Sequence, residues 1–125
     1  MGWSLKRFYE NSFLKTKAKR VGKLITAVKN GTAALSTLSF SAERKAELKD
    51  IENEEIDDLQ KIKAKLQEGK NLGVYDLGIL EGYLYIENGR PAHKDLRSLP
   101  AKEHAKYQAI LRNIAAKARK VLKSA

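Results

Sequence analysis

The chain contains no cysteine, which excludes disulfide scaffolds, thiolate metal sites and cysteine nucleophiles. Long hydrophobic runs are also missing, since no stretch approaches the roughly 20 apolar residues needed to cross a bilayer. Residues 1–13 lack an apolar segment followed by a small-residue cleavage site, so we expect no secretory signal. The lack of a membrane-spanning run and of a secretory signal predicts a cytoplasmic protein, whereas the lack of cysteine says nothing about the compartment.

Side chains that could carry out catalysis or hold a metal are scarce. His93 and His104 are the two histidines, and their separation matches no metal-ligand spacing. His104 falls on the apolar side of a predicted helix, where a core or boundary role is favoured, whereas His93 lies in a basic segment. No glycine-rich loop of the phosphate-binding type is present. We therefore predict a non-catalytic protein with no metal and no cofactor.

Two groups of acidic residues could carry chemistry, but a surface role is favoured for both. Glu81 and Glu87 flank a pair of tyrosines in an apolar stretch, where buried carboxylates could have shifted pKa values. Helical spacing instead favours their placement on an exposed stripe. Residues 54–58 hold four carboxylates that could attract a divalent cation, yet they lack the glycine turn and fixed spacing of a calcium loop.

The strongest compositional feature is charge. The formal net charge is +10 and the pI is about 9.8. Residues 1–40 and 90–125 are strongly basic, whereas acidic residues collect between Glu47 and Asp58. A positive surplus of this size attracts nucleic acid, anionic membrane surfaces and acidic proteins. The alternative is intramolecular, with the acidic stretch folding against a basic arm and neutralising part of it.

Apolar residues recur at steps of three and four over most of the chain, which predicts amphipathic helices. Ser41 is a suitable N-cap and Gly69 a suitable C-terminal stop for the second long helix. The sequence therefore predicts an all-α fold. We expect a small helical bundle built on a long antiparallel helical hairpin, residues 12–38 and 41–69, plus a basic C-terminal helix over 100–123. Residues 1–125 are predicted to form a single domain.

Shorter segments are assigned on weaker patterns. Residues 1–11 form a short aromatic and basic segment, after which Asn11 or Ser12 would cap the first long helix. Residues 72–88 are the most apolar part, and a buried helix is favoured over a β-hairpin. Gly78 and Gly82, four apart, would let a neighbouring helix approach closely. Residues 93–99 are predicted to form a loop or a single turn, and a helix break near Gly31 is left open.

With its turn near residue 40, the predicted hairpin places Asp58 near Arg20 and Lys23. The same register brings the lysines at 61, 63 and 65 beside those at 15, 17 and 19. Pairing with acids would thus neutralise the middle of the hairpin and leave its far end strongly positive. The candidate binding residues are Lys15, Lys17, Lys19, Arg20, Lys61, Lys63 and Lys65, with Arg112, Lys117, Arg119 and Lys120 on the last helix as a second group.

Clustered cations give salt-dependent, largely sequence-independent affinity for nucleic acid. Lysines greatly outnumber arginines, which favours contacts to backbone phosphates over bidentate reading of guanine. We therefore predict non-catalytic nucleic-acid binding, to DNA or RNA. Composition alone would also suit a phage or mobile-element protein.

Two other classes stay open. A protein–protein module, such as an inhibitor, an adaptor or a virion component, would use the acidic stretch or the aromatic N-terminus to hold a partner. Peripheral binding to an anionic membrane is the second alternative, and a homodimer is compatible with either class. The aromatic residues that would insert are Trp3, Phe8, Tyr9 and Phe13.

Overall fold

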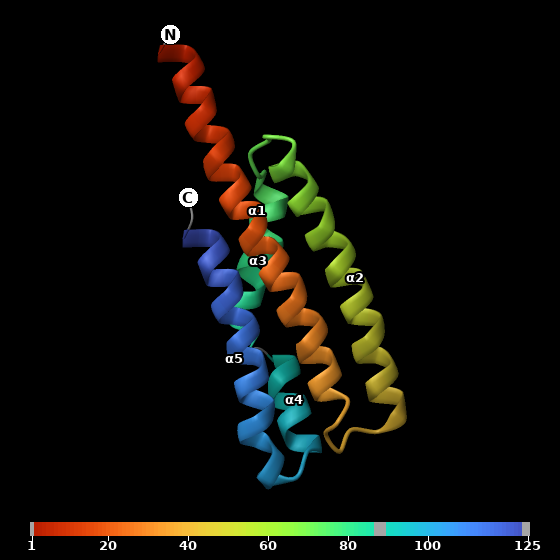
Figure 1. Ribbon diagram of the computed structural model, residues 1–125. Coiled ribbons are helices and arrows are strands. Elements are labelled where there is room, and N and C mark those ends of the chain that lie inside the picture. Colours follow the sequence, from red (N-terminus) through yellow and green to blue (C-terminus); the bar gives the residue numbers. More distant parts are fainter. Residues whose placement is uncertain (1, 87–89, 124–125) are drawn as a thin grey trace.

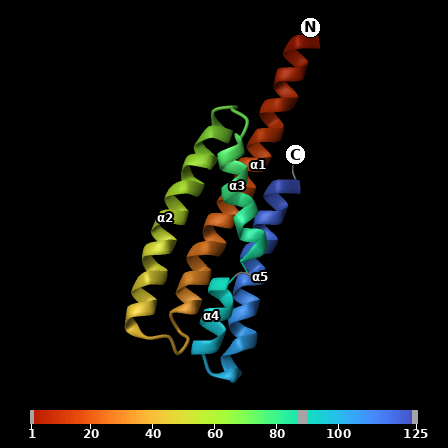
Figure 2. The same cartoon turned by 180° about the vertical axis from the view of Figure 1, so that it is seen from behind.

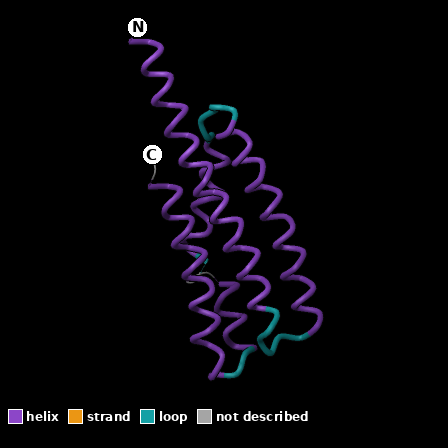
Figure 3. Tube along the Cα trace, viewed as in Figure 1, coloured by secondary structure: helices purple, strands orange, loops and turns teal. Residues whose placement is uncertain are grey.

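The computed structural model describes residues 2–86 and 90–123, and the regular elements in those ranges are all helical (Figure 1, Figure 3). The prediction of an all-α bundle is confirmed. The elements are α1 (Gly2–Leu35), α2 (Ala42–Gln67), α3 (Val74–Gly82), the 3-10 turn η1 (Tyr83–Tyr85), α4 (Arg90–Ser98) and α5 (Ala101–Lys123).

Helix α1 is the centre of the bundle. It packs against α2 on one side and α5 on the other, while α3 and η1 pack on α5. Figure 2 shows α3 and α4 on the face of α1 opposite the viewer of Figure 1. The N-terminal turns of α1 project beyond the end of the bundle in both views. This arrangement leaves α1 bordered by different neighbours on its two faces.

The predicted start of the first long helix at Asn11 or Ser12 is wrong, because α1 runs without a break from Gly2. Residues 3–21 contain neither proline nor glycine, so nothing in that stretch terminates a helix once it has begun. A suitable capping residue therefore marked no boundary here. The helix also continues through Gly31, so the break left open at that position does not occur.

The predicted boundaries of α2 are confirmed by their capping contacts. The Ser41 hydroxyl accepts a hydrogen bond from the Arg44 backbone N–H at 3.1 Å. At the other end Gly69 has a positive φ of 79°. Its N–H donates to the Leu66 carbonyl, and the Lys70 N–H donates to the Lys65 carbonyl, as in a Schellman motif.

Two apolar clusters hold the helices together. The larger joins α1, α2, α3, η1 and α5 around fully buried side chains such as Leu24, Leu59 and Leu80. Each such side chain contributes roughly 1.5–3 kcal/mol by burial. The smaller cluster lies beside the turn between α1 and α2, where the rings of Phe40 and Tyr107 meet edge-on with centroids 6.1 Å apart.

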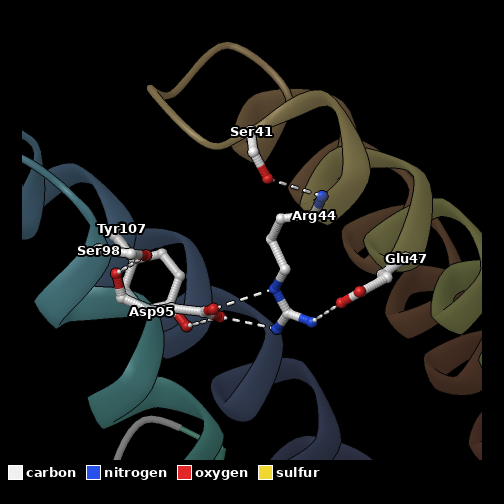
Figure 4. A network of polar contacts seen from close by, with 6 residues as sticks. All are labelled: Ser41, Arg44, Glu47, Asp95, Ser98 and Tyr107. Carbon is white, nitrogen blue, oxygen red and sulfur yellow. Dashed lines mark hydrogen bonds and ion pairs between the residues drawn. The ribbon is translucent and has the colours of Figure 1, made fainter.

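The predicted loop or single turn over residues 93–99 is wrong, because α4 occupies Arg90–Ser98. Its packing combines the half-buried Leu96 with polar contacts of Asp95, and so few apolar positions gave little signal to a search for apolar periodicity. The buried Asp95 carboxylate receives two hydrogen bonds from the Arg44 guanidinium, each 3.0 Å long, and one from the Tyr107 hydroxyl at 2.8 Å (Figure 4). Asp95 thus ties α4 to both α2 and α5.

Within the predicted segment 72–88, a helix forms over α3, while residues 87 and 88 lie outside the described residues. One side of α3 faces outward. Val74 is 89% exposed and Tyr75 77% exposed, whereas Leu80 is fully buried. The predicted close approach at Gly78 and Gly82 is wrong, since a Cβ at either position would have nothing within 4 Å.

The close approach occurs instead at Gly31, where α1 meets α5. A Cβ there would lie 2.8 Å from Ile114 Cδ1 and 3.3 Å from Ile110 Cγ2. This glycine therefore allows a backbone contact that a larger residue would obstruct.

Candidate functional site

A long hollow follows the side of α1 that faces away from α3 and α4. Its volume is about 930 Å³. Small side chains and Gly22 on α1 leave the space open, and longer polar side chains from three helices border it. The lining residues are Lys15, Ala18, Lys19, Gly22, Lys23, Thr26, Ala27 and Asn30 of α1, Lys63 and Gln67 of α2, and Asn113 and Lys117 of α5. We call this hollow the lysine groove.

Helix periodicity explains why these cations meet. Lys15, Lys19 and Lys23 follow one another at a spacing of four residues, so they lie on one face of α1, about 6 Å apart along its axis. Lys63 and Lys117 approach the same face from α2 and α5. The Lys63 ammonium lies 3.4 Å from the position that a Cβ on Gly22 would take. Five cations therefore surround one hollow.

The charge around the lysine groove has one sign, because none of the described residues that line it is acidic. Lys23 was predicted to lie near Asp58, yet Lys23 lines the groove and Asp58 lines a different hollow. Glu52 and Glu55 of α2 line that other hollow together with Asp58. The predicted neutralisation between the two long helices thus does not reach this face of α1.

Of the candidate residues, Lys15, Lys19, Lys63 and Lys117 line the groove, while two of the others are paired with carboxylates. The Lys61 ammonium lies 3.0 Å from Asp57, and both side chains are exposed. The Lys65 ammonium lies 2.9 Å from the buried Asp76. The hydrogen bond from Lys65 lowers the pKa of Asp76, although burial acts in the opposite direction. Lys61 and Lys65 thus have carboxylate partners on the protein.

The remaining candidates lie elsewhere. Lys17 is buried, and that burial lowers the pKa of its ammonium group. The Arg20 guanidinium donates to the Lys120 carbonyl at 3.4 Å, at the C-terminal part of α5. The other cations of the second group are exposed on α5 but are not among the described groove residues; they are Arg112, Arg119 and Lys120.

Lys23 and three amide residues line the groove but were not among the sequence candidates. Asn30, Gln67 and Asn113 are amides that can both donate and accept hydrogen bonds. No charge pattern singles them out. Each amide lies one helical turn from another groove residue on the same helix. This spacing could have identified them once the packing of α1 between α2 and α5 was known.

The groups considered for chemistry take structural or surface positions. A His104 ring nitrogen lies 3.0 Å from the Leu99 carbonyl oxygen, as expected for a hydrogen-bonded boundary histidine. Glu81 and His93 are exposed, and Glu87 lies outside the described residues. Within those residues no group of histidine and carboxylate side chains is placed to hold a metal ion.

The membrane alternative depends on apolar and aromatic residues at the N-terminal end of α1. Among the described residues, no helix combines the length and the apolar character that a bilayer span requires. Phe13 is 45% exposed near the projecting end of α1. The side chains of Trp3, Phe8 and Tyr9 lie outside the part of the chain whose side chains are described.

The fold and the groove together define a small helical bundle with a cationic hollow along its central helix. Comparisons with protein-family models, with curated proteins and with solved structures gave no significant match.

Proposed function

We propose that this protein binds the phosphate backbone of nucleic acid in the lysine groove, without catalysis. The observation that supports the proposal is the meeting of five lysines from three helices around one hollow with no acidic lining residue in the described chain. Backbone phosphates are the natural counterions for such a row, since each neutralised phosphate releases condensed cations into solution.

Electrostatic repulsion within the groove favours an anionic ligand. Like charges one helical turn apart destabilise a helix by roughly 0.2–0.5 kcal/mol per pair. Lys15, Lys19 and Lys23 form two such pairs on α1 alone. A bound polyanion would convert this repulsion into attraction, so binding should stabilise the folded protein.

The chemistry of the groove favours binding without base readout. An ammonium group contacts a phosphate as a point charge and lacks the forked donors that recognise guanine. The amides of Asn30, Gln67 and Asn113 could add hydrogen bonds to phosphate or sugar oxygens. We expect affinity that depends weakly on sequence and strongly on salt.

Fluorescence anisotropy with labelled single-stranded DNA, duplex DNA and RNA tests this proposal. Between about 50 and 200 mM salt, the logarithm of the association constant should fall linearly with the logarithm of salt concentration. The triple variant K15Q/K19Q/K63Q should weaken binding and reduce the slope by roughly 2–3, because each lost phosphate contact removes about 0.7–0.9.

A matched control removes the same number of charges elsewhere. Lys61, Lys70 and Lys102 are exposed and are not among the described groove residues. The variant K61Q/K70Q/K102Q should keep most of the affinity and the slope. Equal losses in the two triple variants would show that net charge alone drives binding, and no binding of the parent protein at low salt would refute the proposal.

A further inference from the structure

A second hollow lies on the opposite side of α1, between α2 and the elements α3, η1 and α4. Its volume is about 550 Å³, within the usual range of small-molecule sites. Its walls are mostly apolar, with side chains such as Leu48 and Ile51 of α2 and Ile79 of α3. Residues of α1 that line it, among them Val28 and Thr32, lie on the face of that helix opposite the lysine groove. We call this hollow the tyrosine cavity.

One wall of the tyrosine cavity is acidic. Glu52, Glu55 and Asp58 of α2 line it together. Glu52 is paired with Lys49 at 3.1 Å, but among the described residues no cation is paired with Glu55 or Asp58. Glu55 and Asp58 therefore form no close ion pair within the described chain, although the Lys61 ammonium is near enough to Asp58 for the two charges to interact.

A buried tyrosine hydroxyl belongs to the same cavity lining as these carboxylates. Tyr83 lines the cavity, is only 5% exposed, and its hydroxyl has no hydrogen-bond partner among the described residues. Buried hydroxyls nearly always have a partner, because leaving one unpaired is costly. The hydroxyl and the Glu55 carboxylate are close enough for each to shift the pKa of the other through a hydrogen-bond interaction, but their geometry falls outside that of a standard hydrogen bond.

The remaining charged groups of the cavity are already satisfied. Arg44 and Asp95 stand at one end and bind each other through two hydrogen bonds. Burial raises the pKa of Glu55; the Tyr83 hydroxyl acts against this rise, and the charges of Glu52 and Asp58 add to it.

We propose that the tyrosine cavity binds a small organic cation, an amine with an apolar body. Its ammonium would donate hydrogen bonds to Glu55, Asp58 and the Tyr83 oxygen. Its apolar body would fill the remaining volume, and the tyrosine rings of the wall favour a nearby positive charge. A metal ion fits less well because the described residues offer no metal-ligand group here. This inference is independent of nucleic-acid binding in the lysine groove.

The probes are 4-phenylbutylamine and its neutral counterpart 4-phenylbutan-1-ol, titrated into the isotopically labelled full chain and followed by NMR chemical shifts. We expect shifts at residues that line the tyrosine cavity. The amine should bind about tenfold more tightly than the alcohol, a difference typical of one charge-assisted hydrogen bond. Equal affinity for both probes, tighter binding of the alcohol, or absence of binding by the amine would overturn the proposal.

Two variants and one matched control test whether the amine binds in the tyrosine cavity. Glu55→Gln should weaken amine binding about tenfold and leave the affinity for the alcohol almost unchanged. Tyr83→Phe should weaken amine binding several-fold. Glu54→Gln removes the same charge from an exposed neighbour and should leave binding unchanged. Circular dichroism of each variant verifies the fold. If Glu54→Gln weakened binding as much as Glu55→Gln in folded proteins, general charge rather than the cavity would be responsible.

Discussion

Replacing Tyr107 by phenylalanine removes a single hydroxyl from the centre of the bundle. That hydroxyl donates a 2.8 Å hydrogen bond to Asp95, and both residues are buried. The ring contact with Phe40 should persist, since phenylalanine keeps the same aromatic body. Asp95 would retain both hydrogen bonds from Arg44 and so would not become an unpaired buried charge.

Hydrogen bonds to charged groups typically contribute about 1.5–3 kcal/mol to stability. We expect Tyr107→Phe to lower the free energy of unfolding by about 2 kcal/mol. Tyr83→Phe removes an equally buried hydroxyl that has no partner among the described residues, so it should be neutral or stabilising by up to about 1 kcal/mol. The structure therefore predicts different effects for two chemically identical substitutions.

Urea denaturation followed by circular dichroism measures the difference. With a slope of about 2 kcal/mol per molar urea, the midpoint for Tyr107→Phe should fall by roughly 1 M and the slope should stay unchanged. Equal losses in the two variants would refute the assignment of paired and unpaired hydroxyls. A larger loss for Tyr83→Phe would show that its hydroxyl has a partner in solution.

Further substitutions test the packing and the electrostatics. Gly31→Ala should lower the stability of the fold by about 1–3 kcal/mol through overpacking against α5. Gly78→Ala should raise it by up to about 1 kcal/mol, because nothing lies near the added methyl group. Thermal denaturation that showed stability changes of the same sign for both variants would contradict this. Asp76→Asn should cost about 1 kcal/mol at neutral pH. Lys65 lowers the pKa of Asp76, so the contribution of Asp76 to folding stability is present above the ordinary carboxyl pKa and is lost as the pH falls through the lowered value. The urea midpoints of parent and variant should therefore converge in acid. Lys17→Met should be stabilising at neutral pH, because burial lowers the pKa of the ammonium and charging it costs stability; the gain should vanish as pH rises toward the ordinary value of 10.5.

The long helices could be predicted from the sequence because their signals are local. Apolar residues at steps of three and four and the caps at Ser41 and Gly69 each act within a few residues. Helix α4 could not be predicted in this way. Its attachment depends on Asp95 meeting Arg44 and Tyr107, which are far away along the chain.

The lysine groove could be predicted from the sequence only in part. Lys15 and Lys19 share a helix face by periodicity, but the addition of Lys63 and Lys117 depends on how α2 and α5 pack on α1. Lys17, between the first two, falls on another face and is buried. Counting cations in a cluster therefore overestimated the site, whereas selecting positions four residues apart would have separated these three lysines.

The tyrosine cavity could not be predicted from the sequence, for a related reason. Residues 54–58 read as a solvated acidic face, yet Glu55 and Asp58 line the cavity while Glu54 and Asp57 are exposed. Neighbouring carboxylates thus have opposite environments, because successive helical residues point about 100° apart. Which of them becomes enclosed depends on the other helices that complete the cavity around α2.

A row of like charges on α1 is compatible with a stable fold because the other side of the helix is deeply buried. Val21, Leu24 and Val28 are almost completely inaccessible to solvent, and each contributes roughly 1.5–3 kcal/mol. Repulsion between lysines one turn apart costs only about 0.2–0.5 kcal/mol per pair, and salt reduces it. The packing contribution exceeds the repulsion several-fold, so groove lysines can be replaced by neutral residues without loss of the fold. A loss of polyanion binding in K15Q/K19Q/K63Q would therefore report the missing charges rather than unfolding.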